Sequence, residues 1–256
     1  MATAAAGLVF GLAVGIQPSD ARLATIFITV LMTQLSIGAL NDWADRHSDT
    51  LAQRTKPLVR GQASPRLALG LAIVFALGAL PGALMFGATA ALVLTIGLAA
   101  GWAYDLVLKP TPLSVVPFAV AFPMLPSWVA VIAGFHLSQL SSLMVAGAFL
   151  AAAIHLGDSL PDLQMDVRSG IHSLGVVLGR SGSLQAMILC TLVGGAVALT
   201  ALWSRPLMLG LIAAAGLAAL TLLAVVVRAN PAHARWVAGA FAMVACLGLL
   251  SGLRHG

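Results

Sequence analysis

The chain contains no glutamate and few charged residues of any kind. Charged residues make up 8% of its 256 positions, whereas a soluble domain carries about 25%. Hydrophobic residues make up 60% and form long runs that rarely contain a charge. This composition excludes an ordinary soluble domain and predicts a polytopic membrane protein surrounded by the lipid bilayer.

Cysteine is also scarce, and the two cysteines lack the spacing of a zinc site or a disulfide. Cys190 and Cys246 lie in separate apolar runs and are expected to be small buried side chains. No glycine-rich phosphate loop of the P-loop type is present. The net charge of +5 fits basic loops beside anionic headgroups, so we expect no nucleic-acid partner.

Apolar segments divide the whole chain. Backbone polar groups must be satisfied within the segment in a bilayer, so runs rich in Ala, Leu and Gly indicate helices. The first run is not preceded by the basic stretch of a signal peptide, and we expect it to be retained as a helix. Nine segments are expected, at about 3–17, 22–40, 67–86, 88–104, 113–134, 137–157, 182–203, 206–227 and 234–253.

Lysine and arginine are distributed unequally between the two sides that these segments define. The opposite loops hold three basic residues, Arg22, Arg205 and Arg254. The positive-inside rule places the richer side in the cytoplasm, with the N-terminus inside and the C-terminus outside. That side holds the other ten of the 13, namely Arg46, Arg54, Lys56, Arg60, Arg66, Lys109, Arg168, Arg180, Arg228 and Arg235.

All eight acidic residues are aspartates, and seven of them lie in three short polar segments on the cytoplasmic side. Only Asp20 lies elsewhere. Anionic groups close to a bilayer are costly unless they are paired, so this concentration predicts a cationic partner, most simply a divalent ion. The first segment holds Asp42, Asp45 and Asp49, the second holds Asp105, and the third holds Asp158, Asp162 and Asp166.

The spacing within the first and third segments fits helices. The first three aspartates are spaced i, i+3 and i+7, and they share one face if the second apolar helix continues through them. The last three are spaced i, i+4 and i+8, and they share a face if their segment stays helical, with Pro161 as a candidate kink. The alternative is that these aspartates are solvated loop or capping residues.

The two larger clusters indicate a coarse internal repeat. One follows the second apolar segment and the other follows the sixth, a shift of 116 residues from Asp42 to Asp158. We expect one intramembrane domain over 1–256, built from two four-helix halves (about 1–112 and 113–256) plus one helix, around a central cavity. Two facing carboxylate clusters holding Mg²⁺ would form a receptor for a diphosphate and neutralise it as a leaving group.

Basic residues next to the clusters fit the same interpretation. Arg54 and Lys56 follow the first cluster, and Lys109 follows Asp105 by four residues. Guanidinium and ammonium groups bind diphosphate oxygens. The alternative is that they only anchor the cytoplasmic side, which is the favoured interpretation of the more distant arginines.

At these residues the sequence resembles the UbiA-type intramembrane prenyltransferases. Residues 41–49, Asn-Asp-x-x-Asp-x-x-x-Asp, resemble the first family signature. Residues 54–64 resemble the stretch R-x-R-P-L-x-x-G-x-x-S, with Lys56 where arginine is common. Residues 104–109 are similar to the Tyr…Lys loop after helix four, and 162–170 resemble the second signature, Asp-x-x-x-Asp with a downstream glycine.

The resemblance implies an all-α fold of nine transmembrane helices and a bacterial plasma-membrane enzyme with its mouth on the cytoplasmic side. The implied reaction is Mg²⁺-dependent transfer of a prenyl group from a prenyl diphosphate to an aromatic or other lipophilic acceptor. It implies catalytic roles for Asp45, Asp162 and Lys109. It further implies diphosphate binding by Asn41, Arg54, Lys56, Tyr104 and Lys109, and Mg²⁺ binding by Asp42, Asp45, Asp49, Asp158, Asp162 and Asp166.

Several alternatives remain open. Asp158 stands where the family often has Asn, and is either an extra ligand or an acceptor-side group. A membrane terpene cyclase would ionise the same diphosphate without an acceptor, and a polyprenyl or lipid-type acceptor is a third option. A secondary transporter is disfavoured because transporters place their carboxylates near the midplane, whereas these lie in loops on one side.

Overall fold

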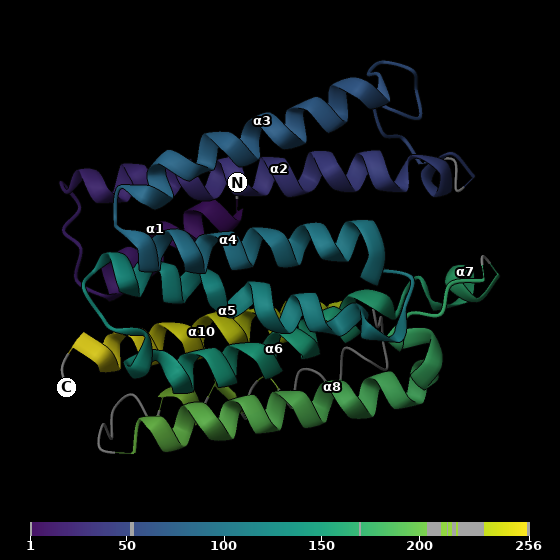
Figure 1. Ribbon diagram of the computed structural model, residues 1–256. Coiled ribbons are helices and arrows are strands. Elements are labelled where there is room, and N and C mark those ends of the chain that lie inside the picture. The colour runs from purple at the N-terminus through teal and green to yellow at the C-terminus, as the bar shows by residue number, and fades with distance from the viewer. Residues whose placement is uncertain are drawn as a thin grey trace.

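The computed structural model describes most of the chain, and every regular element in the described part is helical. Seven of the described helices are long and apolar enough to cross a membrane, and Ala2–Ala13 is a shorter apolar helix. The protein is therefore an integral membrane protein, with its long helices running roughly parallel (Figure 1). The described residues are 2–51, 54–168, 170–203, 211–213, 215–216, 219 and 233–254.

The helices follow the order expected from the apolar segments. The first part comprises α1 (Ala2–Ala13), α2 (Ala21–Leu51), α3 (Pro65–Leu84), α4 (Ala88–Ala103), the π-helical turn η1 (Tyr104–Leu108) and the 3₁₀ turn η2 (Pro112–Ser114). The second part comprises α5 (Val115–Ile132), the 3₁₀ turn η3 (Leu137–Leu140), α6 (Ser141–Ser159), α7 (Leu163–Arg168), α8 (Leu174–Ala201) and α10 (Ala234–Arg254).

Eight of the nine expected segments correspond to these helices. The expected segment 206–227 falls largely outside the described residues, so the nine-helix count and the four-helix repeat stay predictions. The continuation of the second segment as a helix through the first aspartate cluster is confirmed, because α2 extends to Leu51.

The third polar segment does not stay helical. Helix α6 ends at Ser159, residues 160–162 form a turn, and α7 begins at Leu163. Proline lacks a backbone N–H and its ring crowds the preceding turn, which accounts for a break at Pro161. The condition for one shared face is therefore not met, and the three aspartates lie on α6, in the turn and on α7.

The core lies where α1, α2, α5, α6 and α10 meet. Helix α5 packs against α4 and α6, and α6 packs against α8 and α10, while α3 lies on the outside of α2. Trp128, Ile26 and Leu150 are fully or almost fully buried in this core. Outward-facing apolar residues such as Val74 and Leu77 of α3 are more than half exposed, as expected for a surface that contacts lipid.

The polar segments meet at one end of the bundle. Figure 1 shows the C-terminal end of α2, the end of α4 and α7 together there, with the C-terminus at the opposite end. Between α2 and α3 the chain folds back over 54–64. Gly61 turns it with a φ of 69°, and the Ser64 side chain accepts a hydrogen bond from the Leu67 N–H at 3.1 Å to start α3.

Candidate active site

The first aspartate cluster is held together by lysines. The Lys56 ammonium lies 2.8 Å from Asp42 Oδ1 and 2.8 Å from Asp49 Oδ2, so it bridges two carboxylates that are two helical turns apart. Arg54 Nε lies 3.5 Å from the other oxygen of Asp49. The Asp49 side chain is 5% exposed, so its charge is compensated inside the protein rather than by solvent.

The carboxylates around Lys56 raise its pKa. Burial acts to lower its pKa, but hydrogen bonds and charge interactions with Asp42 and Asp49 outweigh burial and raise the pKa. Lys56 therefore stays protonated, and the loop 54–64 delivers a permanent positive charge to the end of α2.

The turn after α4 completes this half of the site. The η1 turn places Lys109 against Asp45 Oδ2, and Asn41 Nδ2 donates to the buried Asp105 Oδ1 at 3.0 Å. The Lys109 N–H donates to the Tyr104 carbonyl oxygen at 2.9 Å, the hydrogen bond of a π-helical turn. Such turns are frequent at functional sites, and this one points Lys109 at α2.

The aspartates of the third segment lie in the same region but have fewer basic partners. Asp158 Oδ1 accepts a hydrogen bond from Arg235 of α10 at 3.1 Å. Asp162 is exposed, Asp166 is half-buried, and neither has an ion pair with another described residue. Burial raises the pKa of Asp166 and the charge of Asp162 raises it further, while Lys109 and Arg54 oppose the shift.

Two hydrogen bonds tie the chain just after the third segment to residues 110–114. The His172 N–H donates to the Pro110 carbonyl oxygen at 3.1 Å, and the Leu174 N–H donates to Ser114 Oγ at 3.2 Å. Ser114 Oγ also lies 3.0 Å from Nε2 of the buried His155 on α6. The predicted diphosphate and metal residues from all three segments are therefore brought to one end of the protein.

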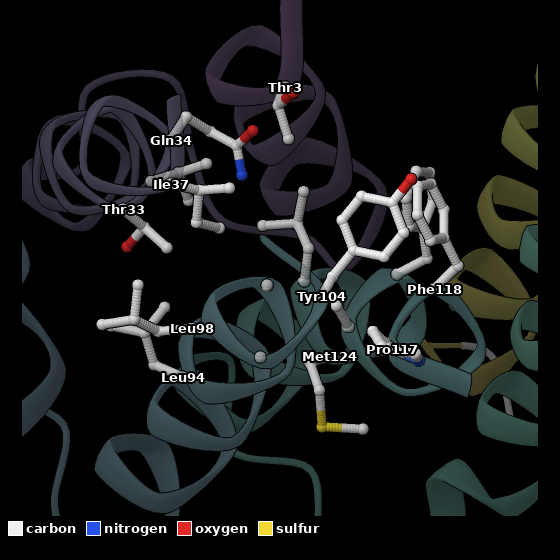
Figure 2. Close-up of a pocket in the computed structure, with 16 residues that line it drawn as sticks. Thr3, Thr33, Gln34, Ile37, Leu94, Leu98, Tyr104, Pro117, Phe118 and Met124 are labelled. Carbon is white, nitrogen blue, oxygen red and sulfur yellow. The ribbon is translucent and has the colours of Figure 1, made fainter. Parts of the chain in front are cut away.

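An apolar cavity of about 240 Å³ opens next to this polar end, between α1, α2, α4 and α5 (Figure 2). Tyr104 lines the cavity, and its ring lies 5.9 Å from the Lys109 ammonium, which makes it the junction between the two environments. None of the cavity residues is charged. They are Thr3, Val30, Thr33, Gln34, Ile37, Leu94, Gly97, Leu98, Gly101, Tyr104, Pro117, Phe118, Ala121, Phe122, Met124 and Leu125.

The carboxylates do not form a closed metal cage. Among the described residues, no three Asp, His or Cys side chains converge closely enough to hold an ion by themselves. They converge on cations in smaller sets, with Asp42 and Asp49 around one ammonium and Asp45 on another. Mg²⁺ usually binds one or two carboxylates and completes its shell with water and phosphate oxygens, so this donor set suits it.

Comparison with known families identifies the family of the chain. The sequence model of the UbiA prenyltransferase family matches residues 1–251. The chain belongs to the UbiA prenyltransferase family. It is 28% identical over 258 aligned residues to the bacteriochlorophyll synthase 33 kDa chain of Cereibacter sphaeroides, covering 93% of this chain and 82% of that protein. It is 29% identical over 180 residues to a 4-hydroxybenzoate octaprenyltransferase of Coxiella burnetii, covering 66% and 62%.

Solved structures of UbiA homologues share the fold. A homologue from Archaeoglobus fulgidus bound to GPP and Mg²⁺ superimposes with a TM-score of 0.74 at 18% identity, covering 98% of this chain and 95% of that one. A digeranylgeranylglyceryl phosphate synthase structure gives a TM-score of 0.76 at 15% identity, covering 100% and 94%. These structures show the UbiA fold, and the family match identifies the protein as a prenyltransferase.

Some UbiA motif residues have structural roles that the sequence did not reveal. Gly61 and Ser64 of the 54–64 stretch form the turn and the cap before α3. His155 and Arg235 were not among the predicted site residues. In the structure His155 contacts Ser114, and Arg235 contacts Asp158. Their only sequence signal is a polar residue in a long apolar helix or at its start, which does not identify a partner.

Proposed function

We propose that this UbiA-family enzyme transfers a prenyl group from a prenyl diphosphate to an aromatic or other lipophilic acceptor within the membrane, with Mg²⁺. The observation that carries the proposal is the junction at Tyr104. On one side lies a cluster of carboxylates and lysines, and on the other an uncharged cavity. A prenyl diphosphate has the same two parts, an anionic head and an apolar tail.

Mg²⁺ fits the anionic side. Asp42, Asp45 and Asp49 offer hard oxygen ligands, and Asp162 and Asp166 present carboxylates without an ion pair among the described residues. Asp158 is engaged by Arg235 and is the weakest candidate of the set. When bound there, Mg²⁺ would neutralise charge on the departing diphosphate. The Archaeoglobus fulgidus homologue bound to GPP and Mg²⁺ supports this assignment.

The chain's own residues support ionisation followed by capture. Lys109, Lys56 and Arg54 lie where they can bind the diphosphate oxygens as the bond between C1 and oxygen breaks and its electron pair leaves with the diphosphate. The apolar cavity wall excludes water from the allylic cation. The acceptor supplies the electron pair of the new bond at C1, and its proton passes to a carboxylate or to the diphosphate.

The distribution of basic residues indicates which side of the membrane the active site faces. Ten basic residues on the side of the aspartate segments against three on the other support a cytoplasmic active-site mouth, with the N-terminus inside and the C-terminus outside. We also propose that 1–256 forms a single intramembrane domain.

The test is product analysis by mass spectrometry. Purified protein is incubated with Mg²⁺ and a panel of prenyl diphosphates, with and without phenolic and lipid-type acceptors. Prenylated acceptor is expected, and a cyclised hydrocarbon formed without acceptor would instead indicate a cyclase. Asp45→Asn and Asp162→Asn should each lower kcat/KM by about 10²-fold or more. Asp20→Asn, at the one aspartate outside the three polar segments, is the matched control and should keep activity.

A further inference from the structure

Lys56, predicted as a diphosphate ligand, bridges two aspartates in this structure. Its ammonium contacts one oxygen of Asp42 and one of Asp49, both at 2.8 Å. These two carboxylates lie on one face of α2, so the space between them is the natural place for a shared cation. In this structure that space is filled by a side chain of the protein itself.

Lys56 and a divalent ion cannot use this space together. An ammonium group has donors only, so it cannot act as a ligand. Mg²⁺ binds carboxylate oxygens at roughly 2.0–2.1 Å, and a second positive charge within contact distance would repel it. Binding of a metal between Asp42 and Asp49 therefore requires the Lys56 ammonium to leave.

The burial of Asp49 makes this an exchange and not a simple loss. With 5% of its side chain exposed, Asp49 cannot rely on solvent to stabilise its charge, and Arg54 touches it only at 3.5 Å. An unpaired buried carboxylate is strongly destabilising. The charged form of Asp49 is therefore stabilised by a cation beside it, either Lys56 or the metal.

Once displaced, the Lys56 ammonium can move to the oxygens of a bound diphosphate. Lys56 is 27% exposed and extends from the loop 54–64 on a flexible four-carbon stem, so its head group can move without the backbone. A diphosphate bound to one Mg²⁺ still carries excess negative charge. Lys109 differs, because it contacts one oxygen of a single carboxylate and does not bridge two aspartates.

We propose, building on the proposed function, that Lys56 is a built-in counter-ion that competes with the divalent metal for Asp42 and Asp49 and transfers to the diphosphate when metal and substrate bind together. Lys56 is then a positioning residue with effects of opposite sign. It weakens metal binding in the empty enzyme and strengthens diphosphate binding in the loaded one.

The experiment measures Mn²⁺ binding to the purified full chain by electron paramagnetic resonance, without substrate and with inorganic diphosphate. For Lys56→Met, Mn²⁺ affinity without diphosphate should rise by about tenfold, because a competing charge is gone. Its affinity for diphosphate in the presence of Mn²⁺ should fall. A misfolded variant would lose affinity, so an increase cannot come from unfolding.

Two further variants test whether the effect depends on the charge and the position of Lys56. Lys56→Arg retains the charge and should keep the weak metal affinity of the wild type. Arg60→Met, an exposed cation on the same loop, should change neither affinity by more than about twofold, since exposed charges are screened. A Lys56→Met protein whose Mn²⁺ affinity is unchanged or lower overturns the exchange.

This failure is distinguishable from failure of the proposed function. If the wild type binds Mn²⁺ with diphosphate, and Asp45→Asn does not, the metal–diphosphate site stands whatever Lys56→Met does. If the wild type binds no Mn²⁺ even with diphosphate, both proposals fall.

Discussion

The two aspartate clusters of this protein differ in how their charges are compensated. On α2, every aspartate of the first cluster has a lysine partner, and Asp49 is buried among them. In the other cluster Asp158 is paired with Arg235, whereas Asp162 and Asp166 have no ion pair with another described residue. The first cluster is thus part of the folded framework, and the second presents free carboxylate oxygens.

The backbone differs in the same way. The first cluster lies on one uninterrupted helix, which fixes the relative positions of its side chains. The second is divided between α6, a turn and the six-residue helix α7. A long helix packed against its neighbours resists rearrangement, whereas a short exposed segment can adjust when ligand binds. We therefore expect the second cluster to rearrange more than the first when ligand binds.

The largest expected difference concerns stability. Asp49→Ala should lower the free energy of unfolding by about 2–3 kcal/mol, because it removes a buried carboxylate with charged partners. Asp162→Ala should change it by less than about 0.5 kcal/mol, because this side chain is exposed and unpaired among the described residues. Denaturant titration in detergent gives both values, and equal losses would remove the distinction between the clusters.

A second prediction concerns the packing behind the second cluster. Helices α6 and α10 approach so closely that a Cβ on Gly157 would lie 3.0 Å from the Arg235 backbone nitrogen. Gly157→Ala should therefore cost about 1–3 kcal/mol through overpacking. Gly38→Ala on α2 is the matched control, since a Cβ there meets nothing within 4 Å, and it should be neutral or stabilising by up to about 1 kcal/mol. Similar losses at both positions would contradict this prediction.

The sequence predicts the first cluster better than the second for a physical reason. Residues 41–51 contain neither Pro nor Gly, so the helical spacing of the aspartates carries directly into α2. In the second cluster Pro161 competes with the same spacing, and local preference alone does not decide between a kink and an end. In the structure α6 ends at Ser159, two residues before the proline.

Residue spacing does not predict contacts between segments that are far apart in the sequence. The Asp158–Arg235 pair joins positions 77 residues apart, and Asn41 reaches Asp105 across 64 residues. Lys56 was expected to bind diphosphate, but its bridge between Asp42 and Asp49 depends on how the loop 54–64 folds back. Periodicity identifies which residues share a helix face, and it does not identify which loop covers that face.

The Asp158–Arg235 pair offers a smaller test of charge compensation in the second cluster. Its two side chains are 38% and 42% exposed, so water and salt screen the attraction. A double-mutant cycle with Asp158→Asn and Arg235→Met should give a coupling energy of about 0.5 kcal/mol that decreases in high salt. A coupling of several kcal/mol would place this pair in the same category as Asp49 and weaken the contrast between clusters.

The smallest effect is expected at Asp20, the one aspartate outside the three polar segments. Its carboxylate accepts hydrogen bonds from the Arg22 side chain and from the Arg22 backbone N–H at the start of α2, and these lower the pKa of Asp20 below 3.8. The folded state then binds fewer protons than the unfolded state as pH falls through this range. The stabilisation is complete above the unfolded pKa and is lost as pH falls through the lowered folded pKa. Wild type and Asp20→Asn should therefore differ slightly in unfolding temperature at pH 7, and the difference should disappear as the pH falls through the lowered pKa of Asp20. A difference that persists unchanged at low pH would show that the Asp20 carboxylate acts through something other than its charge.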